Sequence, residues 1–139
     1  MPGVCTVSKS HSPAFKKFCS DLAKRYSQVI CPVYEVSLVF VDESRDDETL
    51  AECFWDKVYL NATIKIYPSL YAMHVAERYD DVAKALLHEF CHYYVHTLYM
   101  VAVDHLPPAL DKHYRDLIEI ATQEITYALY PAFRHKRRA

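Results

Sequence analysis

The residues best suited to chemistry are His88, Glu89 and His92, which belong to the sequence His-Glu-Phe-Cys-His. On a helix, side chains four positions apart lie about 40° apart around the axis and roughly 6 Å apart along it. Both imidazoles can therefore bind one metal ion. Zinc suits them because it accepts nitrogen ligands in tetrahedral geometry and lowers the pKa of a bound water to about 7. Glu89 is placed to take a proton from that water, so the spacing predicts a Zn²⁺ site for hydrolysis.

The motif falls inside a stretch of helical periodicity, and it lies on one side of the expected helix. His88, Glu89, His92 and His96 span only about 100° around the axis. The apolar residues gather on the other side and comprise Leu86, Leu87, Phe90, Cys91, Tyr94 and Leu98. One side is therefore expected to pack on the core while the other collects ionisable groups.

A third ligand is expected on the helix that follows. Glu124 lies about 60° from the centre of that helix's apolar stripe, where a carboxylate can reach the ion while the helix stays packed. Glu119 is expected to face solvent, on the opposite side. His96 lies about 12 Å from His88 along the axis, too far to share an ion with it, and is expected in the pocket wall or in solvent. The apolar stripe comprises Leu117, Ile118, Ala121, Ile125 and Ala128, and the alternatives to Glu124 left open are Glu119, His113 and Asp104.

The remaining elements predict an α+β fold in which helices cover one face of a small sheet. Ser12 and Pro13 form a helix-start signature, and helical spacing continues to Gln28. Residues 34–41, apolar on both faces, should form a central strand. Residues 51–55 suggest a weaker strand, and the alternation in 62–67 suits a strand near the sheet edge. The two later helices are expected from an Asp80 or Asp81 cap to about Met100, and from about Pro108 or Ala109 to Tyr130, ended by Pro131.

Length and composition bound the class of protein. The 139 residues suit one domain with flexible ends at about 1–11 and 134–139. A net charge of −2 predicts no general affinity for nucleic acid or anionic membranes, with only the basic C-terminal tail as a candidate contact. Five cysteines without a Cys-x-x-Cys pair indicate free thiols in a reducing, cytoplasmic compartment. No apolar run approaches the ~20 residues needed to span a bilayer. The single glycine disfavours tight hairpins and hence an all-β fold.

The motif His88-Glu89-Phe90-Cys91-His92, followed by a helix with Glu124, resembles the gluzincin branch of zincin metallopeptidases. The resemblance covers about residues 34–133 and is greatest to short single-domain zincin-like proteins of phages and bacteria, including SprT-like domains. It implies a minimal zincin-like fold with an antiparallel edge strand beside the zinc that binds an extended peptide, and residues 62–67 could supply that strand. SprT-like domains use a histidine as third ligand, so Glu124 departs from them.

The sequence thus predicts a zinc-dependent metallohydrolase, a peptidase acting on a peptide or protein substrate. His88, His92 and Glu124 would hold Zn²⁺, and Glu89 would be general base and later proton donor to the leaving amine. The alternative is a catalytically idle zincin-fold module that binds a partner protein or nucleic acid and keeps the metal for stability. A plain helical domain without metal is the third hypothesis.

Overall fold

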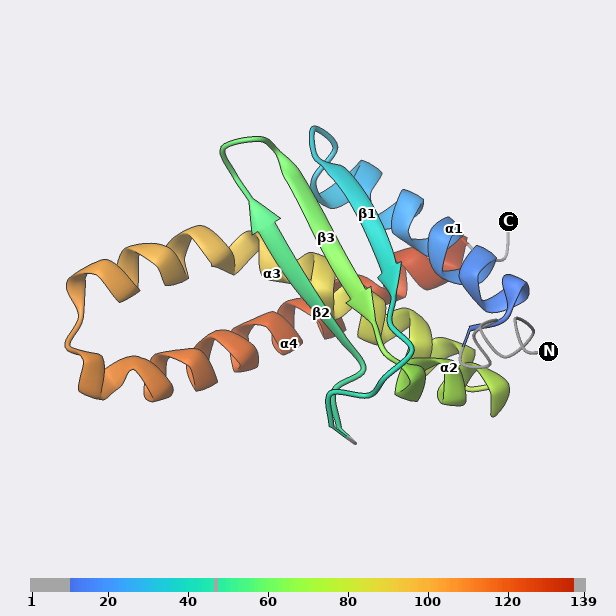
Figure 1. Cartoon of the computed structure of the whole chain (residues 1–139). Coiled ribbons are helices and arrows are strands. Elements are labelled where there is room, and N and C mark those ends of the chain that lie inside the picture. Colours follow the sequence, from blue (N-terminus) through green and yellow to red (C-terminus); the bar gives the residue numbers. More distant parts are fainter. Residues whose placement is uncertain (1–10, 47, 137–139) are drawn as a thin grey trace.

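A computed structural model describes residues 11–46 and 48–136 of the chain. These residues form four α-helices, one short 3₁₀ turn and a three-stranded sheet, so the predicted α+β class is confirmed. The sheet forms one layer and the helices lie on one of its faces (Figure 1). The elements are α1 (Pro13–Ile30), β1 (Glu35–Phe40), β2 (Ala51–Asp56), β3 (Asn61–Ile66), α2 (Pro68–Val75), α3 (Tyr79–His105), η2 (Pro108–Leu110) and α4 (Asp111–Lys136).

The N-terminal helix begins where the sequence predicts. The Ser12 side chain accepts a hydrogen bond from the Phe15 backbone N–H at 3.2 Å, and the helix runs to Ile30, two residues past the predicted end. His11 was expected in a flexible end, but it is buried, and its Nε2–H donates to the Val41 carbonyl at 2.7 Å. Residues 1–10 and 137–139, the rest of the expected flexible ends apart from 134–136, lie outside the described part of the chain.

The strand order is β1-β3-β2, which reverses two sequence expectations. Residues 34–41 contain an edge strand rather than a central one, because within the described part of the chain β1 pairs with β3 alone, in parallel. Residues 62–67 belong to the central strand and not to the edge, because β3 also pairs with β2, antiparallel. The burial pattern explains the error: Val39 faces solvent although it is apolar, whereas Ala62, Ile64 and Ile66 are buried.

Helix α3 is longer than its sequence pattern suggests. It starts at Tyr79 with Arg78 at the N-cap, so Asp80 and Asp81 lie in the first turn, where carboxylates favour the helix dipole, and do not cap it. It continues to His105, five residues past Met100. Helix α2 was not predicted at all, since its eight residues lack a clear apolar face. Pro68 occupies its first turn.

Helix α4 continues through Pro131, which was expected to end it at Tyr130. Proline removes one helical hydrogen bond, but the turn beyond it is held by tertiary contacts. The Phe133 side chain is buried, and its ring lies 4.8 Å from that of Tyr26, edge-on. The Arg25 guanidinium donates to the Phe133 carbonyl. Packing against α1 thus outweighs the local cost of the proline, and residues 134–136, expected to be flexible, are helical.

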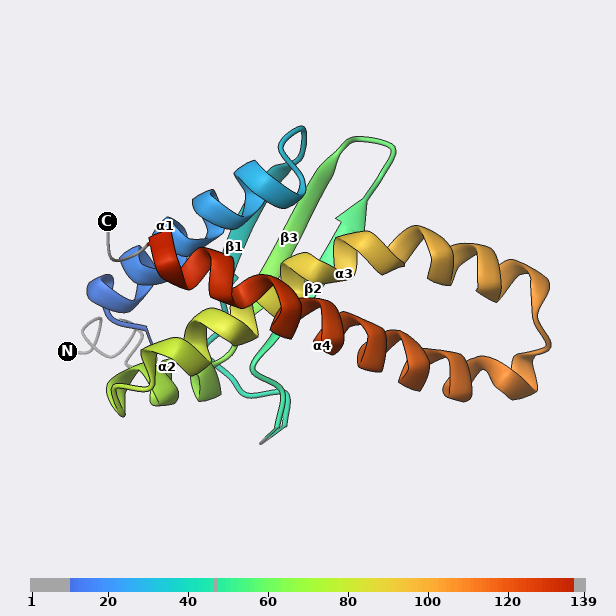
Figure 2. The same ribbon diagram turned by 180° about the vertical axis from the view of Figure 1, so that it is seen from behind.

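Helices α3 and α4 form an antiparallel pair that extends beyond the sheet (Figures 1 and 2). Where α3 lies behind the sheet, its inner face is fully buried, with Leu86, Leu87 and Phe90 at 0% exposure. Farther along the helix, Tyr94 and Leu98, which were predicted on the core side, are exposed. Within the described residues no helix is both long and apolar enough to cross a membrane.

Two connecting turns have left-handed backbone without glycine. Leu60, between β2 and β3, has φ = 55°, and Glu77, between α2 and α3, has φ = 62°. Residues other than glycine, asparagine and aspartate rarely adopt this backbone conformation, because Cβ crowds the following carbonyl oxygen. Neighbouring hydrogen bonds hold both turns: the Leu60 carbonyl accepts from the Glu35 N–H, and the Glu77 N–H donates to the His74 carbonyl.

Candidate metal centre

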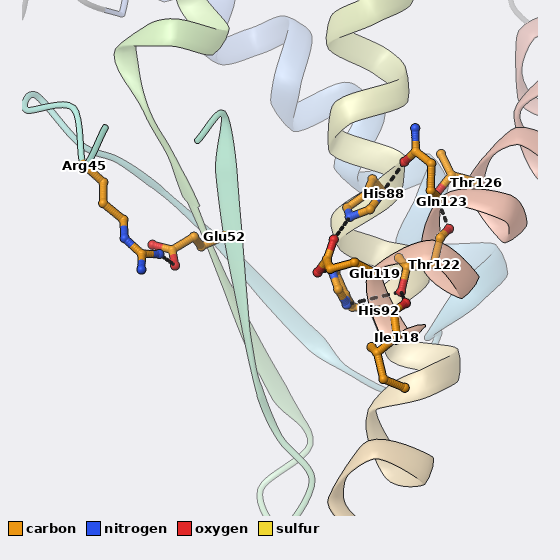
Figure 3. Close-up of polar contacts among 9 residues, drawn as sticks. All are labelled: Arg45, Glu52, His88, His92, Ile118, Glu119, Thr122, Gln123 and Thr126. Carbon is orange, nitrogen blue, oxygen red and sulfur yellow. Dashed lines mark hydrogen bonds and ion pairs between the residues drawn. The ribbon is translucent and has the colours of Figure 1, made fainter. Parts of the chain in front are cut away.

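The histidines of the motif lie on one face of α3, as predicted. Their ring centroids are 4.9 Å apart, and the two side chains are only 18% and 17% exposed. Both rings project from α3 toward α4 (Figure 3). The opposite face of the same helical turns carries Leu87, Phe90 and Cys91 into the core, which fixes the rotation of the helix. Burial of that apolar face therefore orients His88 and His92 toward a shared position.

The carboxylate that meets the histidines is Glu119, not Glu124. Glu119 Oε2 lies 3.1 Å from His88 Nε2, and Glu119 Oε1 lies 3.1 Å from His92 Nε2 (Figure 3). The ligand atoms of these three residues all lie within 4.8 Å of one another. Glu124 is exposed on α4 and does not join them. Glu119, one of the alternatives left open in the sequence, thus occupies the position predicted for Glu124.

The inner face of α4 explains this exchange. Its buried side chains include Thr122 and Thr126, which hydropathy does not mark as inward-facing. Each hydroxyl donates to the carbonyl four residues earlier, Ile118 or Thr122, so the helix satisfies them internally. Relative to Thr122, Glu119 lies about 60° around the axis and Glu124 about 160°. The apolar stripe used to place Glu124 is half exposed, as Leu117 is 45% exposed.

The far nitrogens of both histidines are held by hydrogen bonds. Nδ1–H of His88 donates to Gln123 Oε1 at 2.7 Å. Nδ1 of His92 lies 3.5 Å from Thr122 Oγ1, whose own hydrogen goes to the Ile118 carbonyl, so the imidazole is the donor there too. Protonation at Nδ1 leaves the Nε2 lone pairs of both rings directed at Glu119. Contacts of this kind fix the tautomer and orientation of metal-binding histidines.

This arrangement fits a divalent cation. With both Nδ1 atoms protonated, the two Nε2 lone pairs and the Glu119 carboxylate are all acceptors, an arrangement that positive charge between them would stabilise. Protons can supply that charge in the metal-free protein. Tetrahedral zinc with bonds of about 2.0–2.1 Å would hold its donors about 3.3 Å apart, close to the separations present. Hydrogen bonds with His88 and His92 hold the pKa of Glu119 well below its usual range, which keeps the carboxylate charged.

Glu89 is buried beside these residues. It is only 9% exposed. Burial raises its pKa to about 7, because desolvation outweighs the attraction of His92 and His88 for the charged form. A carboxyl group with a pKa near neutrality can both accept and return a proton under ordinary conditions. The environment of Glu89 is therefore suited to the role of general base predicted from the motif.

The centre opens into a cleft of about 680 Å³ between β2, α3 and α4. The inner face of β2 forms one wall, and His96, expected in the pocket wall, lies in the lining. A second hollow of about 400 Å³ lies toward the start of α3. His88 and Glu89 line both spaces, so the candidate metal centre adjoins both hollows.

Other sequence candidates lie elsewhere. His113 and Asp104 are exposed near the far end of the α3–α4 pair and do not approach the histidines. Cys91 is buried and hydrogen-bonded to Thr126, in keeping with a structural thiol. Sequence reasoning missed Gln123 and Thr122, although Gln123 stands four residues after Glu119, one helical turn along. It also missed Cys53, which no spacing rule connects to the motif.

Comparisons with protein-family models, with curated proteins and with solved structures found no match to this chain. The function is therefore argued from the geometry of the site.

Proposed function

We propose that this protein is a zinc-dependent peptidase of the zincin type, with His88, His92 and Glu119 as the protein ligands of the ion. The observation that carries the proposal is the convergence of two Nε2 atoms and one carboxylate, each histidine anchored through Nδ1, beside a buried glutamate. A zinc ion bound there would lower the pKa of a water to about 7 and polarise a carbonyl group.

The residues of the chain have separable tasks. Glu89 accepts the proton of the attacking water and later delivers it to the leaving amine. Gln123 and Thr122 keep the imidazoles in one tautomer and one orientation. Glu119 contributes negative charge to the centre. Its side chain is 59% exposed, so this ligand lies on the solvent side of the centre.

The shape of the cleft favours an extended peptide as substrate. β2 pairs with β3 along one edge only, and among the described residues no strand covers its other edge. Thr49 and residues 51–55 line the cleft, so unpaired backbone groups are available to a peptide laid beside the centre. This role was expected of residues 62–67, whose backbone is instead used within the sheet. Because hollows adjoin His88 and Glu89 on two sides, we expect a substrate chain to extend past the centre in both directions, as cleavage inside a chain requires.

The decisive experiment is proteolysis by the zinc-loaded protein and by Glu89→Gln. Unfolded protein substrates would be incubated with each, and new chain ends identified by mass spectrometry. The wild type is expected to cut internally, and Glu89→Gln to keep zinc but cut about 10²–10⁴-fold more slowly. Equal cutting by both would show a contaminating protease. No cutting by zinc-loaded wild type would refute the peptidase and favour a zinc-holding binding module.

A further inference from the structure

A second group of potential ligands adjoins the candidate metal centre and shares one residue with it. Cys53 of β2, Glu89 and His92 present ligand atoms that all lie within 4.8 Å of one another. Cys53 lies on the face of β2 that packs against the core, as do Ala51 and Trp55. The preceding residue, Glu52, turns its side chain to Arg45, away from the histidines (Figure 3). Strand alternation therefore directs the thiol at the centre.

The thiol is enclosed by the residues that build the site. It is hydrogen-bonded to Glu89, and the charge of Glu119 reaches it as well. Burial raises the pKa of Cys53, so without a metal the group stays a neutral thiol and is not a nucleophile. A bound metal ion changes this, because a coordinating thiol is deprotonated outright. The chemistry of Cys53 thus depends on the ion held by its neighbours.

The two ligand groups are best served by a single ion. His92 belongs to both, and its Nδ1 is turned to Thr122, so only Nε2 is free to bind a metal. An ion on that nitrogen adjoins both groups. Cys53 does not belong to the group of His88 and Glu119, so its side chain must turn toward them to bind the same ion. Two imidazoles, a carboxylate and a thiolate are four ligands of the kinds that zinc accepts.

We propose that Cys53 Sγ is the fourth protein ligand of the metal ion in the resting protein. This inference rests on the proposed metal centre. On binding, the Sγ–H bond breaks, the sulfur keeps the electron pair and bonds to the metal, and the proton leaves to solvent. A site with four protein ligands has no position open to water or substrate. Cys53 must therefore leave the ion before hydrolysis can occur, and the zinc-loaded wild type cuts through the fraction of molecules in which it has left.

The test replaces zinc by Co²⁺, whose spectrum reports its ligands. Metal-free wild type, Cys53→Ala and Cys91→Ala would each be titrated with Co²⁺. Thiolate ligation gives a charge-transfer band in the near ultraviolet, while tetrahedral Co²⁺ gives visible d–d bands with or without sulfur. Cys91→Ala is the matched control, because Cys91 is a buried thiol in the motif that bonds with Thr126 and belongs to neither ligand group.

The wild type and Cys91→Ala are expected to show both kinds of band. Cys53→Ala should keep the visible bands, which prove that it is folded and loaded, and lose the near-ultraviolet band. Its zinc affinity should fall by at least the roughly 10- to 100-fold that loss of an outer-shell partner costs. Visible bands without a thiolate band in wild type would overturn this inference and leave the metal centre standing. A thiolate band that survives in Cys53→Ala would overturn it too, whereas no Co²⁺ binding at all would overturn the proposed function itself.

Discussion

Glu119 and Glu124 differ by five positions on one helix, and the direction of each side chain decides which can serve a metal. Glu119 stands one turn before Gln123 and Thr122, the residues that anchor the two histidines. The pair His88 and His92, with Glu89, could be predicted from sequence because their spacing alone defines a common face. The carboxylate that meets the histidines could not, because threonines on the inner face of α4 look polar in sequence yet are buried there.

Removing Glu119 should therefore weaken metal binding more than removing Glu124. Glu119→Ala removes a charged candidate ligand next to both Nε2 atoms. Glu124→Ala changes an exposed side chain on the far side of the same helix. Zinc titration by calorimetry should give one site per chain in wild type and in Glu124→Ala, with similar affinity. Glu119→Ala should bind at least about tenfold more weakly. The reverse ranking would reject our choice of ligand.

Glu89 should lower the stability of the metal-free protein above neutral pH. Its folded-state pKa of about 7 exceeds the ordinary value of 4.5, so the folded state holds the proton more tightly than the unfolded state. The free energy of unfolding therefore falls as pH rises from about 4.5 to about 7, and levels off above that. The difference in pKa corresponds to about 3 kcal/mol.

Glu89→Gln removes this dependence, since glutamine resembles the protonated acid. In urea denaturation of metal-free protein, the variant should be more stable than wild type by up to about 3 kcal/mol at pH 8 and nearly equal at pH 4.5. The exposed Glu43→Gln is the control and should show no such difference. A constant gap between Glu89→Gln and wild type across this pH range would contradict the assigned burial cost.

At the scale of elements, sequence patterns identified which segments form helices and strands better than they predicted where those elements end and which strands pair. Apolar periodicity found α1, α3 and α4, although each helix ends beyond its predicted last residue. The strand order escaped it, because pairing partners depend on the whole sheet and not on one strand's alternation. Pro131 shows the same limit: the local rule ends the helix, but packing of Phe133 on α1 extends it.

That packing predicts a strong effect of Phe133→Ala. The ring is 5% exposed and rests on Tyr26, and replacing a buried phenylalanine by alanine costs about 3–5 kcal/mol. Ile120→Ala, on an exposed part of the same helix, should change the free energy of unfolding by about 0.5 kcal/mol or less. Chemical denaturation of both variants tests this. Equal losses would show that the turn beyond Pro131 is not held by its contact with α1.

At the scale of the molecule, the candidate centre lies at the junction of α3, α4 and the free edge of the sheet. His88 and His92 come from α3, Glu119 from α4, and Cys53 from β2. The outer half of the α3–α4 pair has little of the sheet behind it (Figure 2). A metal ion bound here would join elements that are otherwise held together by side-chain packing and the anchoring hydrogen bonds.

Zinc should accordingly raise the stability of the whole fold. A ligand that binds only the folded state at 100 times its dissociation constant adds about 2.7 kcal/mol. Differential scanning calorimetry of wild type should show the unfolding midpoint rising by several degrees with added zinc, in proportion to the logarithm of its concentration. His92→Ala should show little or no rise. A midpoint in wild type that is indifferent to zinc would argue against a metal centre built into the folded state.

The left-handed turns at Leu60 and Glu77 are positions where substitution can increase the stability of the fold. Each holds a side chain where glycine would sit without crowding, at a cost of about 1–2 kcal/mol, and neither residue lines the cleft. Part of that strain can be relieved by one substitution, less the extra freedom glycine gives the unfolded chain. Leu60→Gly with Glu77→Gly would make a sturdier background for damaging variants of the centre. In that background, loss of metal could be separated from loss of the fold.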